Sequence, residues 1–241
     1  MIRKLLVIGV LCIFALSITS AGTAQERQKK DNQFGITLGY TAGYQLFSPD
    51  PPAVDNNPDT KPHKWTKSLR PGYAIGLNVE RVWRGNIHFA PELLLVKTGD
   101  KFYHMDKETS YKTLRKTEFT NYFLIVPLTF KYYIRRISIA SFVPYIVAGP
   151  ELAYLIKSKQ EPYIISGDPN DTDAKKWLKT STWGFSVGTG FSYKMPNSPL
   201  TFFSNLRWTR SFQHYNNTNP AFDPKAKINY TIIMLTFGAR F

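Results

Sequence analysis

Large apolar residues alternate with small or polar ones along most of this chain. The clearest example is WGFSVGTGFSYK, residues 183–194, in which aromatic and aliphatic side chains occupy every second position except Thr189 and mostly glycine and serine fill the others. Alternation with a period of two predicts a half-buried β-strand. Seven further segments show this pattern: residues 34–47, 73–83, 87–99, 121–134, 142–156, 200–213 and 231–241. The sequence therefore predicts an all-β protein with eight strands.

The connections between these segments alternate in length. Three are short, at residues 84–86, 135–136 and 196–198. Four are long and rich in Pro, Asn, Asp and Lys, at residues 48–70, 100–116, 157–180 and 216–226. Long and short connections in strict succession are typical of an up-and-down barrel that has tight turns at one end and extended loops at the other.

Two classes of barrel share this strand order, and the side on which the large residues lie separates them. In a soluble, lipocalin-like barrel the large apolar residues line a pocket and polar residues face water. In a membrane barrel the large residues face lipid, and small residues fit a narrow lumen. Here the aromatic residues stand opposite glycine, serine and threonine. We therefore expect an eight-stranded antiparallel up-and-down transmembrane β-barrel, with both termini at the periplasmic end and four outward loops.

The last segment, TIIMLTFGARF, ends on an aromatic residue. An unpaired strand edge is not tolerated in lipid, so this strand is expected to pair with the first strand and close the barrel. Its side chains Phe237 and Phe241 are then expected to face hydrocarbon and interface. They resemble the C-terminal signal by which outer-membrane barrels are recognised for insertion.

The first residues have the pattern of a secretory signal peptide. Arg3 and Lys4 precede an apolar run at residues 5–18, and small residues such as Ala24 follow. The run is too short to span a membrane as a helix. We expect a signal peptide at residues 1–24, a barrel domain at residues 25–241 and location in the cell outer membrane. The only cysteine, Cys12, would leave with the signal, so no disulfide is expected.

Successive side chains of a strand point to opposite faces, and this alternation (parity) places several polar and charged side chains in the lumen. They are Glu80, Glu92, Lys131, Glu151, Lys194, Asn205 and Arg207. Buried charges must be paired, and an eight-stranded barrel is just wide enough for side chains to fill it. We expect a structural network of ion pairs and hydrogen bonds, with a proton or ion pathway as the alternative.

The long connections are basic, and the whole chain has a formal net charge of +14. The basic residues of these connections include Lys64, Lys67, Arg70, Lys112, Arg115, Lys116, Lys175, Lys176 and Lys179. At the outer surface they could contact lipopolysaccharide phosphates through charge-assisted hydrogen bonds, or they could be ordinary solvated loops. An exported protein is not expected to bind nucleic acid, so the expected partners are outer-membrane lipid, lipopolysaccharide and other envelope proteins.

No catalytic, metal or cofactor site is predicted. The histidines His63, His88, His104 and His214 are scattered, and no pair has metal-ligand spacing. Ser211 and His214 have opposite parity, and no carboxylate of matching parity lies on their strand. The chain is therefore not expected to be an enzyme.

Four prolines fall inside predicted strands: Pro91, Pro127, Pro144 and Pro150. Each removes a hydrogen bond from the strand ladder. Pro127 is the most central of them in its strand, and a bulge or a lost pair is predicted there.

Three stretches together resemble the PorT-like outer-membrane β-barrel family of Bacteroidetes. They are YFLIVPLTFKYYI (residues 122–134), FAPELLLVKTGD (89–100) and PYIVAGPELAYLI (144–156). The resemblance covers essentially the whole chain after the signal, but Ile125 stands where the family usually has a glutamate. It implies an integral outer-membrane barrel, and the name-giving member is associated with type IX secretion. The expected role is a non-enzymatic scaffold or partner-binding component at the cell surface. The alternatives are a narrow ion or proton channel and an outer-membrane lipid-modifying enzyme.

Overall fold

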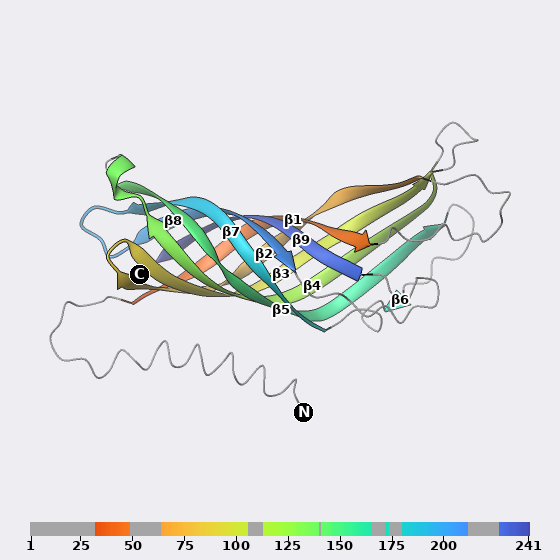
Figure 1. The fold of residues 1–241 in the computed structure, drawn as a ribbon, viewed down its shortest axis with the longest axis horizontal. Coiled ribbons are helices and arrows are strands. Elements are labelled where there is room, and N and C mark those ends of the chain that lie inside the picture. The colour runs from red at the N-terminus through yellow and green to blue at the C-terminus, as the bar shows by residue number, and fades with distance from the viewer. Residues whose placement is uncertain are drawn as a thin grey trace, which may run out of the picture.

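Eight long β-strands close into a tube in the computed structural model (Figure 1). The structure describes residues 32–48, 64–105, 113–139, 141–164, 172–173, 180–211 and 227–241. The long strands are β1 (Gln33–Ser48), β2 (Lys64–Arg84), β3 (Ile87–Met105), β4 (Thr113–Tyr133), β5 (Phe142–Ile164), β7 (Ser181–Lys194), β8 (Thr201–Ser211) and β9 (Lys227–Arg240).

Every long strand pairs in antiparallel fashion with both of its neighbours. The order is β4-β3-β2-β1-β9-β8-β7-β5, and a further pairing of β4 with β5 closes the ring. The short strand β6 (Thr172–Asp173) pairs only with β5 and lies outside the closure. The predicted fold class is confirmed, including the pairing of the last strand with the first. In the described residues there is no helix with the length and hydropathy needed to cross a membrane.

The large apolar side chains face outward. Phe185 and Leu235 are 40% and 39% exposed, whereas Ser186 and Asn205 on the other face are 0% and 1% exposed. Burial alternates residue by residue along most of β7 and all of β8. On these strands the outward face therefore consists mainly of large apolar residues and the inward face mainly of small and polar ones, as the alternation predicts.

The tight turns lie at one end of the tube. The β2–β3 turn contains Gly85, whose φ of 57° lies in the left-handed region that glycine adopts without a steric cost. Asn197 has a φ of 59° in the β7–β8 turn, and asparagine is among the few other residues that tolerate this conformation. Between β4 and β5 the chain makes a short 3-10 helix, η1 (Arg135–Ile137).

Strands β2 to β5 are much longer than the sequence predicts. They contain 19 to 23 residues, whereas β8 contains 11. About ten residues are enough for a tilted strand to span a bilayer, so β2–β5 extend beyond the membrane at the long-loop end. The loops predicted at residues 48–70, 100–116 and 157–180 are therefore partly strand. The prediction was wrong there because these stretches are mostly polar and do not alternate between apolar and polar residues.

The pairing of β4 is interrupted around Pro127 without a shift of the register, and Pro127 itself loses its partner on β3 while it keeps one on β5. Against β5, pairing stops after Pro127↔Glu151 and resumes at Phe130↔Ala148. Against β3, Pro127 falls in the unpaired stretch between the pairs of Pro91 and Leu94. The prediction of a lost pair at Pro127 is confirmed.

Candidate functional site in the barrel lumen

Glu80 is the centre of a buried cluster near the short-turn end of the lumen. Its carboxylate pairs with Arg240 and with Lys131, whose Nζ lies 3.0 Å from Oε2. The hydroxyl of Tyr133 donates a hydrogen bond of 2.7 Å to Oε1, and Nδ1 of His88 lies 2.8 Å from the same oxygen. These five residues belong to four different strands, β2, β3, β4 and β9, so the cluster ties opposite walls of the barrel together.

Aromatic rings surround the two cations of this cluster. Lys131 Nζ lies 5.1 Å from the ring centroids of both Tyr145 and Phe203. The guanidinium carbon of Arg240 lies 4.9 Å from the Phe203 centroid. A cation over a ring face is attracted by the ring quadrupole. The cations are thus stabilised by ring faces as well as by Glu80.

A second charged group lies further along the lumen. Arg207 Nη2 donates a hydrogen bond of 2.6 Å to Glu92 Oε1, and both side chains are buried. Glu151 accepts hydrogen bonds of 2.5 Å from Ser186 and 3.2 Å from Thr209. Together the two groups contain three carboxylates and three cations, so the ionised forms balance without an external counterion.

An apolar layer fills the lumen next to the second charged group. It consists of Ala74, Leu94, Val96, Phe123, Ile125, Leu155, Tyr230, Ile232 and Met234, each at most 5% exposed. The rings of Phe123 and Tyr230 meet edge to face at 5.0 Å. On the long-loop side of this layer, Asn121 donates a hydrogen bond of 2.9 Å to the Tyr230 hydroxyl. The alternating pattern does not predict this layer, because it indicates a polar lumen.

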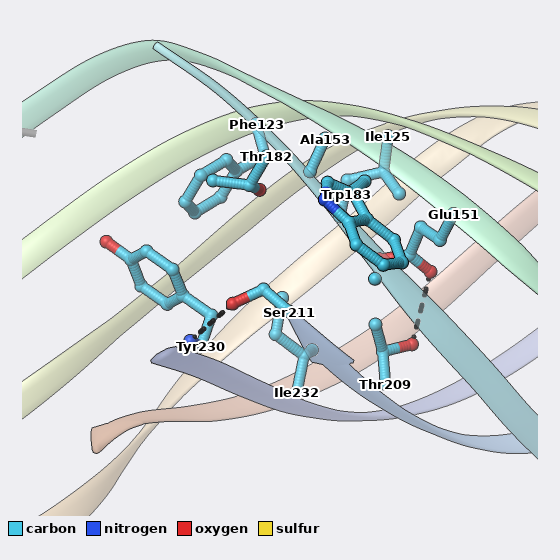
Figure 2. A pocket seen from close by; sticks show the side chains of 11 residues that line it. Phe123, Ile125, Glu151, Ala153, Thr182, Trp183, Thr209, Ser211, Tyr230 and Ile232 are labelled. Carbon is cyan, nitrogen blue, oxygen red and sulfur yellow. Dashed lines mark hydrogen bonds between the residues drawn. The ribbon is translucent and has the colours of Figure 1, made fainter. Parts of the chain in front are cut away.

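A small cavity of about 20 Å³ lies between the apolar layer and the polar side chains of β5, β7 and β8 (Figure 2). Phe123 and Tyr230 lie on one side of it, and Glu151 and Thr209 on the other. This volume is enough for about one water molecule. It is too small for an organic substrate.

The structure places most of the predicted lumen residues inside the barrel and one outside. Glu80, Glu92, Lys131, Glu151, Asn205 and Arg207 are all buried. Lys194 is exposed, because it is the last residue of β7 and lies at the short-turn rim, where solvent reaches it. Arg240 was missed, although its position three residues after Phe237 gives it inward parity.

The predicted basic loop residues divide into three groups. Lys64, Lys67, Arg115 and Lys116 lie on strands rather than loops, and Lys112, Lys175, Lys176 and Lys179 lie outside the described residues. Arg70 also lies on a strand, and its guanidinium pairs with Glu118 at 3.1 Å. Its charge is therefore already compensated within the protein. The signal peptide predicted at residues 1–24 lies outside the described residues.

Phe237 and Phe241 face outward, with 55% and 65% of their surfaces exposed. The backbone of Phe241 exchanges two hydrogen bonds with Phe34 of β1, of 2.8 and 3.0 Å. Their role as an insertion signal stays a prediction. Within the described ranges, no three His, Cys, Asp or Glu side chains come close enough to hold a metal ion.

A closed barrel with a lipid-compatible outer face and paired charges in its lumen defines an integral membrane protein of the outer-membrane type. The sequence match agrees. A family model described as outer membrane protein beta-barrel domain matches residues 23–216, and the chain belongs to this family. The narrower PorT-like resemblance stays a prediction.

Among curated proteins no sequence matches this chain. Among solved structures it is similar to Neisserial surface protein A, with 12% identity, coverage of 86% of this chain and 97% of the other, and a TM-score of 0.40. It is similar to OprG from Pseudomonas aeruginosa, with 15% identity, coverage of 88% and 97%, and a TM-score of 0.42. For the outer membrane protease OmpT from Escherichia coli the values are 10% identity, 90% and 98% coverage, and a TM-score of 0.47. At such scores no activity transfers from these proteins to this chain.

Proposed function

We propose that this protein is a non-enzymatic outer-membrane barrel that acts as a scaffold or partner-binding component at the cell surface. The observation that carries the proposal is the filled lumen. Ion pairs around Glu80 and Arg207 occupy one part of it, and an apolar layer around Phe123 occupies the next.

The filled lumen supports a role that is carried by the outside of the molecule. Water and ions need a continuous polar path, and the inward side chains of the apolar layer are almost without accessible surface. At the long-loop end, in contrast, β2–β5 project beyond the length that a bilayer requires. This extension offers a surface for another envelope protein.

A pull-down of the protein from detergent-solubilised outer membrane tests the proposal. The PorT-like resemblance leads us to expect type IX secretion components among the recovered proteins. A register-matched deletion is the informative variant, because residues 64–69 pair with residues 100–105. Removing both segments shortens the β2–β3 extension on both strands and leaves the membrane part intact. Loss of the partner in this variant supports the extension as the contact, whereas the absence of any reproducible partner of the intact protein contradicts a scaffold role.

A second candidate is a narrow proton pathway. Among the described side chains, both polar atoms of the Asn205 amide and the Nε and Nη1 atoms of Arg207 are buried without a hydrogen-bond partner. Such groups favour internal water, which could carry protons through part of the lumen. Planar-bilayer recordings distinguish the two functions, since a proton pathway predicts a pH-gradient-driven current and a closed scaffold predicts none.

A further inference from the structure

Two adjacent rows of outward-facing side chains cross strands β1–β5 in register. One row is apolar until its last member: Leu38, Ile75, Leu95, Leu124 and Tyr154 are successive cross-strand partners. The next row towards the long-loop end changes character: it runs Tyr40, Tyr73, Lys97, Tyr122 and Lys157. This change from aliphatic residues to tyrosine and lysine marks the boundary of the lipid-facing band on the long-loop side, because aromatic girdles lie at the membrane interfaces of such barrels.

A groove of about 640 Å³ lies at this boundary, on the outer face of β2–β5. Its apolar members include Leu95 and Ile156, and its basic members are Arg70, Lys97, Lys157 and Lys159. Lys157 and Lys159 are exposed, and Lys97 is half-buried. None of the lining residues in the described part of the chain carries a carboxylate.

The lysines give the groove its positive charge. Arg70 pairs with Glu118 at 3.1 Å and donates a hydrogen bond of 2.6 Å to Thr120, so its charge is compensated. The Nζ of Lys97 lies 5.8 Å from the Tyr73 ring centroid, a weak contact that leaves its donors available. One strand separates the strands of Lys97 and Lys157, so their backbones are about 10 Å apart. Their flexible ammonium groups can converge on one headgroup.

We propose that this groove binds the phosphorylated headgroup of an outer-leaflet lipid, with Lys97, Lys157 and Lys159 contacting phosphate. The position of the groove argues for a lipid, because an amphiphile places its chains against the apolar row and its headgroup against the lysines. The long-loop end of an outer-membrane barrel faces the exterior, so the lipid belongs to the outer leaflet. Charge complementarity argues for phosphate, since lysine binds it as a flexible point charge. The site lies outside the lumen and is independent of the proposed scaffold role.

Titration of the full-length protein with bisphosphorylated lipid A in non-ionic detergent, followed by native mass spectrometry, tests the proposal. The test variant is Lys97→Gln/Lys157→Gln/Lys159→Gln. The matched control is Arg84→Gln/Arg136→Gln/Lys194→Gln, which removes the same number of positive charges from exposed positions at the short-turn end. We expect binding about tenfold weaker in the test variant, since charge-assisted contacts are lost, and unchanged binding in the control.

Four results would overturn the proposal. They are equal affinity of test variant and intact protein, an equal loss in the control, equal binding of a dephosphorylated lipid, and displacement of the lipid by inorganic phosphate at the same concentration. The heat-dependent gel shift of folded barrels verifies that each variant is folded. If the triple variant does not fold, the single variants Lys97→Gln and Lys157→Gln replace it, and each is then expected to weaken binding where Lys194→Gln does not.

Discussion

Arg240 on the last strand and Glu80 on the second form an ion pair inside the lumen. The two side chains lie on strands that do not pair with each other, because β1 separates β9 from β2. Arg240 also donates to the Tyr133 hydroxyl and to Ser192. The closing strand is therefore held by side chains inside the barrel as well as by backbone hydrogen bonds in its wall.

Replacing Glu80 with glutamine is expected to destabilise the barrel by about 3–5 kcal/mol, because Lys131 and Arg240 would remain as buried, uncompensated charges. Urea unfolding in detergent micelles, monitored by the gel shift, measures the change. Arg84→Gln, at the exposed end of the same strand, is the control and is expected to change stability by less than about 0.5 kcal/mol. Equal stability of Glu80→Gln and the intact protein would show that the cluster carries no net stabilisation.

The pair Glu92 and Arg207 is expected to show strong coupling. Arg207→Met alone leaves a buried carboxylate, and Glu92→Gln alone leaves a buried guanidinium, so each is expected to cost about 3–5 kcal/mol. The double variant removes both charges and is expected to be clearly more stable than the sum of the two losses predicts. A double-mutant cycle of unfolding free energies measures this coupling, and additive losses would contradict it.

Opening the apolar layer is expected to make the barrel conduct. Phe123→Ala/Met234→Ala removes two large side chains that are buried in the lumen, and the resulting space can admit water. Planar-bilayer recordings are expected to show small conductance steps for this variant and none for the intact protein. Phe237→Ala/Phe241→Ala, which truncates two outward rings instead, serves as the comparison. Steps of the same size in the intact protein would favour the channel alternative.

An arginine on the outer face is expected to destabilise the barrel in a depth-dependent way. Leu206 and Phe202 both point outward from β8, one at the middle of the strand and one near its short-turn end. Leu206→Arg is expected to cost about 2–4 kcal/mol and Phe202→Arg at most about 1 kcal/mol. Unfolding in lipid vesicles measures both. Equal costs would show that the centre of the lipid band has been misplaced.

Loss of the terminal ring is expected to slow insertion more than it weakens the folded barrel. Phe241→Ser keeps both backbone hydrogen bonds with Phe34 and removes only an exposed side chain. Pulse-chase assembly of the variant in cells measures the rate, and urea unfolding measures the stability. Unchanged assembly would argue against an insertion signal at Phe241.

The membrane-spanning part of the fold could be predicted from the sequence because lipid and lumen impose opposite demands on successive residues. Phe185 and Ser186 are adjacent in sequence and face opposite environments. This contrast predicts where the strands lie, which side chains face lipid and that the sheet closes into a barrel. The lost pair at Pro127 could also be predicted, because proline has no backbone N–H to donate to the hydrogen-bond ladder of a closed barrel.

Two features could not be predicted by this reasoning. The extensions of β2–β5 could not be predicted because their residues are mostly polar and show no alternating pattern. The apolar layer around Phe123 depends on how side chains from opposite walls fit together, which one strand's pattern does not reveal. Lys194 shows a related limit, because parity gives the direction of a side chain but not its distance from the rim. Arg240, in contrast, could have been found from the parity of its strand.

The unequal strand lengths give this barrel a front and a back. On the side of β8 the described strand is about as long as a bilayer requires, whereas on the opposite side β2–β5 continue beyond the membrane. A neighbour that diffuses in the plane of the membrane therefore meets different shapes according to its direction of approach. A barrel of this shape can therefore fix the direction from which a neighbouring membrane protein binds it.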